Sequence, residues 1–317
     1  MKKLVLILPI AAGILWGSAG VFVRKLDAFG MDAWTILSTR MLLGAFLMLL
    51  GILLTKPSLL KVKIKDLWVF GGCGILGILG LNFFYNEAVG EISLSLSAIL
   101  LSMAPIFVMI LSSFIFNEKI TPKKIGCLVF ALIGCAMASG VFEASTGIGL
   151  KVTTRGICMG LLSGFFCALY GIFSKIAANK GYGTVTILFY SLGLSSIILF
   201  PLTDWATTAD FINAVPVGNS IFAVFHSLCT SMLPYLFYSL ALIYLENGKV
   251  SILAGGGEPM AAVVFGLIFF MEVPTMLNLI GLALVISALT TLCVPQKDNP
   301  LVKFALIPVK ALRRAKR

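Results

Sequence analysis

Charged residues are scarce in this chain. Only 12% of its 317 residues are Asp, Glu, Lys or Arg, whereas about a quarter is usual in a soluble domain. Hydrophobic residues make up 59%. A water-soluble fold of this size could not bury so much apolar surface, so the composition predicts a protein of the lipid bilayer.

Side chains that commonly carry chemistry are sparse as well. The chain has one histidine, and its seven cysteines show no ligand spacing, so we expect no metal site and interpret the cysteines as small, buried, reduced side chains. No nucleotide-binding loop, zinc motif or nucleophile elbow occurs. An enzyme embedded in the membrane would need His, Asp or Glu clustered at one face. We therefore expect no cofactor and no enzymatic activity.

Long apolar runs dominate what is present. Each approaches the roughly 20 residues that a helix needs to cross the hydrocarbon core, and together they predict an all-α polytopic membrane protein with ten transmembrane helices. The first run could pass for a signal peptide, but it has a partner in the repeat described below. The runs cover residues 4–23, 33–54, 67–86, 93–116, 123–141, 156–178, 184–203, 219–241, 249–271 and 276–294.

The net charge of +11 is distributed unevenly between the two sides of the membrane. When the loops are assigned alternately, 19 of the 24 Lys and Arg residues fall on the side of the N-terminus. Cationic loops favour the cytoplasm, so both termini are predicted to be cytoplasmic in a multi-pass protein of the inner or plasma membrane. The charge sets topology and indicates no nucleic-acid partner. The basic tail, 295–317, could rest on anionic headgroups or be a disordered topogenic segment.

The two halves of the sequence match at an offset near 154. Five spans per half, an odd number, place the second copy upside down, an architecture of secondary transporters. We therefore predict a first repeat over 1–141, a connecting loop over 142–155 and a second repeat over 156–294. The matched positions are Pro105 with Pro259, Glu118 with Glu272, Trp16 with Tyr170 and Tyr85 with Tyr238.

These features resemble the EamA-type branch of the drug/metabolite transporter superfamily. The similarity rests on the start "LWGSAGVFVRK", on Arg40 early in the second span, and on the "EP…E" pattern of the ninth span. The resemblance implies an exporter or exchanger of amino acids and other small metabolites. It also implies a substrate cavity among helices 1–4 and 6–9, with helices 5 and 10 peripheral. The first-half counterpart of Glu258 is Ala104, so the carboxylate occurs in one repeat only.

Glu258 is the main candidate for the substrate site. At 1.5 Å per residue from Gly248 it lies about 15 Å deep, where an ionised side chain costs about 3 kcal/mol on insertion scales. It could bind a substrate amine or carry a coupling proton, or it could form a structural pair with Arg40 or His226. The predicted substrate-binding residues are Glu258, Pro259, Pro105, Arg40, Asn82, Ser102 and His226.

The other candidates each have two interpretations. The prolines could free carbonyls toward a cavity or form packed kinks. Arg40 could clamp a substrate carboxylate or snorkel to the outer interface, and His226 could relay protons or only pack. Four aromatic residues could form an outer gate and an inner gate, or an interfacial belt. The outer pair is Trp16 and Tyr85, and the inner pair is Tyr170 and Tyr238.

The sequence thus predicts a secondary transporter of small metabolites that works by alternating access around a site at the bilayer midplane. The alternative is a flippase of a lipid-linked polar group. A lateral opening between helices would favour the flippase, and a closed polar pocket would favour a soluble metabolite. The sequence does not define the substrate, the direction of transport, the ion coupling or the oligomeric state.

Overall fold

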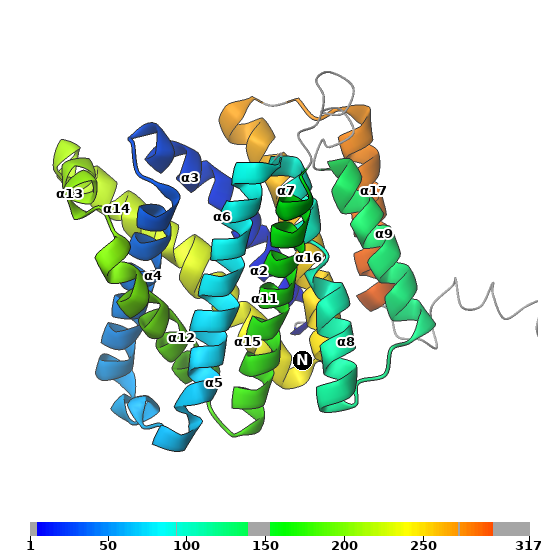
Figure 1. The fold of residues 1–317 in the computed structure, drawn as a ribbon, viewed down its shortest axis with the longest axis horizontal. Helices are drawn as coiled ribbons and strands as arrows, with labels where there is room; N and C mark the ends of the chain where they lie inside the picture. Colours follow the sequence, from blue (N-terminus) through cyan, green and yellow to red (C-terminus); the bar gives the residue numbers. More distant parts are fainter. Residues whose placement is uncertain (1–4, 93, 139–152, 272, 294–317) are drawn as a thin grey trace, which may run out of the picture.

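A computed structural model describes residues 5–92, 94–138, 153–271 and 273–293. These residues form helices and contain no β-strand (Figure 1). Eight helical segments are long and apolar enough to cross a membrane. Glu272, the tail 295–317 and most of the connecting loop predicted at 142–155 lie outside this part of the chain.

The order of the elements follows the predicted runs closely. Short 3₁₀ turns lie at Pro57–Leu60 (η1), Ile64–Asp66 (η2) and Phe200–Leu202 (η4). The first half consists of α2 (Ile7–Gly17), α3 (Ala19–Ala28), α4 (Ala33–Thr55), α5 (Leu67–Gly71), the π-helical η3 (Gly72–Gly80), α6 (Leu81–Glu91), α7 (Leu94–Leu101), α8 (Ala104–Phe116) and α9 (Pro122–Ala138). The second half consists of α11 (Thr154–Asn179), α12 (Thr184–Leu199), α13 (Trp205–Ala214), α14 (Pro216–Ser227), the π-helical η5 (Leu228–Met232), α15 (Leu233–Tyr244), α16 (Asn247–Phe270) and α17 (Met276–Cys293).

The main helix contacts recur when the two halves are exchanged. The helix α2 packs against α16 and α15, and its counterpart α11 packs against α7, α8, η3 and α6. The helix α4 packs against its own counterpart α12, and α9 against α17, a pair at one edge of the bundle in Figure 1. Two similar halves therefore interlock, because each contributes helices to the other's neighbourhood.

Irregular backbone recurs at matched positions in the two halves. The π-helical segments η3 and η5 interrupt the third and eighth predicted spans. The helices α8 and α16 both end at a residue in the left-handed conformation, Asn117 and Met271, each with φ 54°. Such conformations are uncommon outside glycine, so their repetition indicates that the halves share backbone geometry as well as sequence.

The two matched prolines differ in their effect on the helix. Before Pro105 the chain breaks between α7 and α8, whereas Pro259 lies inside α16, which continues through it. The helix is therefore interrupted next to the proline in the first half only. Close packing across Gly257, where an added Cβ would lie 2.7 Å from the Ile10 carbonyl oxygen, holds α16 against α2 through this region.

Two sequence expectations are corrected. The loop predicted between residues 203 and 219 contains the helix α13 and the start of α14. Asp204 caps α13 by accepting hydrogen bonds from the Thr207 hydroxyl at 2.6 Å and backbone N–H at 3.0 Å, and these bonds hold the pKa of Asp204 below its usual range. Cys158 is exposed, so the described cysteines are not all buried.

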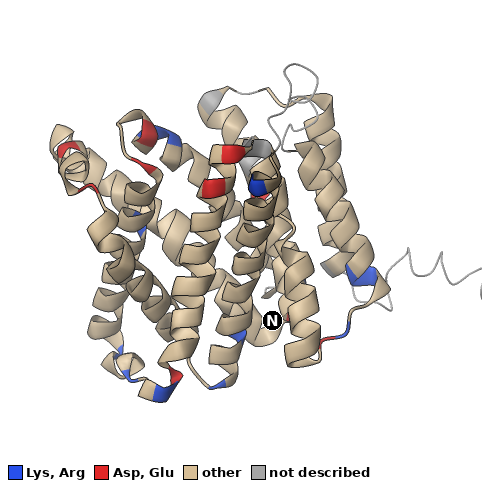
Figure 2. Ribbon diagram, viewed as in Figure 1, with Lys and Arg blue, Asp and Glu red and all other residues tan. Residues whose placement is uncertain are grey.

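One end of the bundle carries most of the described cations, as Figure 2 shows, and the opposite end carries more acidic residues. At the cationic end the loop after α4 is joined to the α11–α12 connection. Asp66 accepts hydrogen bonds from Lys180 and from the Tyr182 hydroxyl, both at 2.7 Å. Tyr190 donates to the Leu60 carbonyl at 2.7 Å. These two loops therefore lie at the same membrane face.

Candidate functional site

Glu258 lies midway along α16 and its side chain is exposed, although protein atoms surround it. Its charge acts on Tyr85 of α6, Cys135 of α9, Cys167 of α11 and Tyr235 of α15. The carboxylate thus lies within electrostatic reach of side chains from both halves of the chain.

Exposed apolar side chains lie on more than one side of α16: Phe269 is 58% exposed and follows Glu258 by eleven residues, about three helical turns, so it shares the side of Glu258. Leu267 is exposed, and it follows Glu258 by nine residues, about two and a half helical turns. Leu267 and Glu258 therefore project from opposite sides of the helix. Among the described residues Glu258 forms no salt bridge, either with Arg40 or with His226. The structural pair considered from the sequence is not formed.

Each of the two prolines leaves one backbone carbonyl without its usual helical hydrogen bond. The Gly255 carbonyl, which Pro259 cannot bond, is approached at 4.0 Å by the Cys135 thiol. Pro105 leaves the Leu101 carbonyl unbonded in the same way, and Gly164 packs over it: a Cβ on Gly164 would lie 3.4 Å from that oxygen. Both carbonyls are therefore covered by a neighbouring helix.

Asn82 and Ser102 are half-buried and satisfied within their own helices. The Asn82 amide donates to the Ile78 carbonyl at 2.8 Å, and the Ser102 hydroxyl donates to the Ala98 carbonyl at 2.8 Å. Each keeps further acceptor capacity. Both residues therefore remain available to a ligand without leaving a buried group unpaired.

Three of the four predicted gating residues lie in one aromatic cluster. The Trp16 ring is 5.7 Å from that of Tyr238, which is 6.0 Å from that of Tyr170. Tyr235 joins them at 5.1 Å from Trp16 and 4.8 Å from Tyr170. Tyr85 lies apart, near Glu258. The structure thus brings Trp16 to the two residues predicted for the opposite gate, and gating itself stays a prediction.

Tyr235 was not identified from the sequence. It interacts electrostatically with both Arg40 and Glu258, and it contacts the aromatic cluster. The repeat contained a signal for it, because Tyr235 is the counterpart of Asn82 at the offset of 153 that relates Tyr238 to Tyr85. In a repeated sequence, a candidate site residue in one half makes the matched position in the other half a second candidate.

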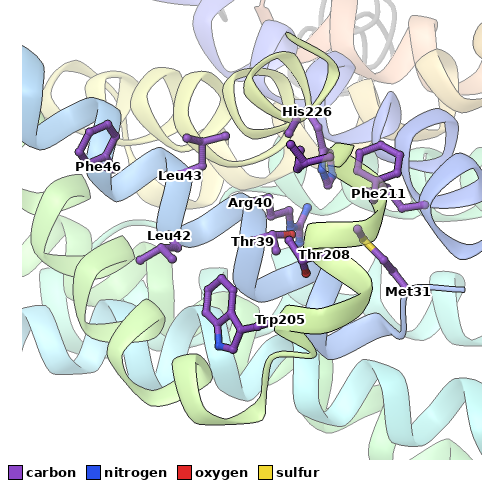
Figure 3. A pocket seen from close by; sticks show the side chains of 13 residues that line it. Met31, Thr39, Arg40, Leu42, Leu43, Phe46, Trp205, Thr208, Phe211 and His226 are labelled. Atoms are coloured by element: carbon purple, nitrogen blue, oxygen red, sulfur yellow. The ribbon is translucent and has the colours of Figure 1, made fainter. Parts of the chain in front are cut away.

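Arg40 and His226 line a separate cavity of about 420 Å³ beside α4, α13 and α14. In Figure 3, Arg40 and Thr39 of α4 point toward the same space as Thr208 of α13. His226 is 2% exposed and its ring stacks on Phe22, with ring centroids 5.1 Å apart. The structure therefore divides the predicted substrate-binding residues between two places.

The geometry defines a multi-pass helical membrane protein with a carboxylate inside its bundle. The profile of the EamA-like transporter family matches the chain twice, over residues 3–140 and 154–293. The chain belongs to this family, and it is a membrane transporter rather than an enzyme.

Related proteins agree with this assignment. The chain is 27% identical to an uncharacterized transporter of Archaeoglobus fulgidus, covering 88% of this chain and 92% of that one. It is 23% identical to the uncharacterized transporter YxxF of Bacillus subtilis, covering 91% and 89%. A protein of known crystal structure shares the fold, with a TM-score of 0.69, 17% identity, and coverage of 92% of this chain and 96% of that one.

Proposed function

We propose that this protein is a secondary transporter, an exporter or exchanger of small metabolites such as amino acids, with its substrate site at Glu258. The observation that carries the proposal is an exposed carboxylate midway along α16 that lies within electrostatic reach of side chains from both halves of the chain. An acid within a membrane span that has no ion-pair partner is costly in lipid. A cationic ligand or a proton would remove that cost.

The proposed mechanism is alternating access between two inverted repeats of five helices each. The packing that survives exchange of the halves, and the recurring π-helical and left-handed residues, support two equivalent units. We place their limits at 1–141 and 156–294. The cationic end of the bundle would face the cytoplasm, with both termini on that side of the cell membrane.

Within this site Glu258 would bind a substrate amine or carry the coupling proton. Asn82, Ser102 and the two prolines, Pro105 and Pro259, would line the path. The aromatic cluster closes the space beside it, because Tyr235 contacts Trp16 and Tyr170 while lying within electrostatic reach of Glu258.

The test is the variant Glu258→Gln in proteoliposomes. A substrate is first found by a thermal-shift screen of amino acids, nucleosides and sugars, since a ligand stabilises the state it binds. Counterflow of that substrate is then measured across pH. A hydrogen bond to a charged group contributes about 1.5–3 kcal/mol, so we expect affinity or transport to fall about 10- to 100-fold and its pH dependence to flatten.

The matched control is Glu87→Gln, which alters an exposed carboxylate paired with Arg155. It should transport as the wild type does. If Glu258→Gln kept both the affinity and the pH profile of the wild type, the assignment of the site to Glu258 would be wrong.

A further inference from the structure

Arg40 presents an unpaired cation to an apolar cavity. Its Nε atom is buried and has no hydrogen-bond partner, and none of the described acidic residues forms a salt bridge with it. Tyr235 interacts with it electrostatically, but a tyrosine is neutral near pH 7. The guanidinium therefore lies within a predicted membrane span, Ala33–Thr55, without a counter-ion.

His226 provides a second unpartnered nitrogen in the same cavity. The residue is 2% exposed, lines the cavity, and its Nε2 atom has no hydrogen-bond partner. Buried polar atoms are rarely left without a partner. The Arg40 guanidinium can only donate hydrogen bonds, so a ligand that paired with it would present acceptor atoms, whereas the neutral His226 ring could donate or accept.

The remaining walls are almost entirely apolar. Thr39 and Thr208 are the other polar residues there. The cavity volume of about 420 Å³ is in the range of small-molecule sites, which combine apolar walls with a few polar groups. The apolar lining comprises Leu26, Met31, Leu42, Leu43, Phe46, Trp205, Phe211, Ile212 and Ala223.

Two aromatic residues that line the cavity, Phe46 and Trp205, are 58% and 39% exposed. One wall is α13, whose capping residue Asp204 is bonded to Thr207 and so is not directed at Arg40. A ligand could therefore enter beside α13 and place its charge at Arg40.

We propose that this cavity binds a compact hydrophobic monocarboxylate, at a site separate from Glu258. The planar guanidinium fork matches a carboxylate and can bind it through two parallel hydrogen bonds. The apolar walls accommodate a single aromatic or branched body. This inference does not rest on the proposed transport cycle, because binding at Arg40 can be measured without transport.

The probe is 3-phenylpropionate, titrated calorimetrically into the purified full-length protein in a neutral detergent. We expect saturable binding by the wild type, and binding weaker by at least about tenfold for the uncharged 3-phenylpropionamide and for Arg40→Gln. Arg155→Gln is the matched control, because Arg155 is 62% exposed and already paired with Glu87 and Glu91. It should bind as the wild type does.

A second variant, Arg40→Lys, keeps the test valid if Arg40→Gln does not fold. A separate measurement tests whether a lipid occupies the cavity. Arg40→Lys keeps the charge and loses the fork, so we expect an intermediate affinity for the carboxylate. The proposal is overturned if the amide binds as well as the acid, or if neither Arg40 variant weakens binding. The proposal is also overturned if the wild type does not bind 3-phenylpropionate but is stabilised by phosphatidylglycerol in nanodiscs, and if that stabilisation is lost in the Arg40 variants.

Discussion

Glu118 joins several helices at the cationic end of the bundle. It follows the left-handed residue Asn117 that ends α8. Its carboxylate accepts hydrogen bonds from the backbone N–H groups of Asn247 at 2.7 Å and Gly248 at 3.2 Å. These N–H groups belong to the first turn of α16, which has no side-chain cap of its own. Glu118 therefore caps α16 from another helix.

We predict that Glu118→Ala destabilises the folded protein by about 1 kcal/mol, because two N–H groups lose a charged acceptor. A lower thermal unfolding midpoint in detergent would show this. Glu87→Ala is the control: it breaks only an exposed ion pair with Arg155, so its effect should be a few tenths of a kcal/mol. Equal midpoints for the two variants would contradict the capping role.

The sequence predicted these residues unequally. Glu118 follows shortly after the run predicted at 93–116, but its partner Asn247 lies in the other half of the chain. The sequence placed Glu258 at depth, yet it could not show that Arg40 lies in a separate cavity. Helical spacing gives depth along one helix, whereas partners depend on how helices rotate and cross.

Among the elements, α2 and α16 pack with their backbones in close contact. An added Cβ on Gly13 would lie 2.1 Å from the Ala254 carbonyl oxygen. On the facing helix, a Cβ on Gly257 would lie 3.2 Å from the Gly13 Cα. Small residues let helix backbones approach in this way within lipid. Backbone atoms cannot move aside as a flexible side chain can, so this crossing does not tolerate added volume.

We therefore predict that Gly13→Ala lowers stability by about 1–3 kcal/mol, as overpacked cores do. Gly20 is the matched control, because it lies in the same predicted span and an added Cβ there meets nothing within 4 Å. Gly20→Ala should be neutral or slightly stabilising, since alanine favours a helix. The measurement is the unfolding midpoint in detergent. A Gly13→Ala protein as stable as Gly20→Ala would contradict the crossing.

The ends of a helix could be predicted where an apolar run gives way abruptly to polar residues. They were harder to predict where a polar side chain or an irregular turn interrupts an apolar run. The run predicted at 33–54 became α4, Ala33–Thr55. The first run divides at Ser18, whose hydroxyl bonds back to the Leu15 carbonyl at 2.6 Å, a bond that often bends helices. Of the two matched prolines, Pro105 follows a break between helices and Pro259 lies inside α16, a difference that the sequence did not show.

At the scale of the whole molecule, the distribution of charge gives a testable orientation. The loop after α4 and the α11–α12 connection share one end through Asp66, Lys180 and Tyr182. The helix α13 lies between α12 and α14, in a connection that alternation assigns to the opposite side. The excess of cations predicts that the first end is cytoplasmic.

We predict that, in a background with all native cysteines replaced (Cys158 included, since it is exposed), a cysteine at Ser58 reacts with a membrane-impermeant maleimide only after the cells are opened. A cysteine at Ala209, an exposed position on α13, should react in intact cells. The two sites are each other's control. The reverse pattern, or labelling of both from one side, would refute the proposed orientation.

The contact between Gly13 and Gly257 has a consequence for biosynthesis. The helix α2 is among the first parts of the chain to be synthesised, whereas α16 is among the last. Helices enter the membrane as the ribosome synthesises them. Until α16 is inserted, the face of α2 that contains Gly13 therefore contacts lipid or another protein segment. The bundle can complete its packing only when both helices are in the membrane. In a nascent chain that stops before α16, the face of α2 that contains Gly13 has no helix to pack against.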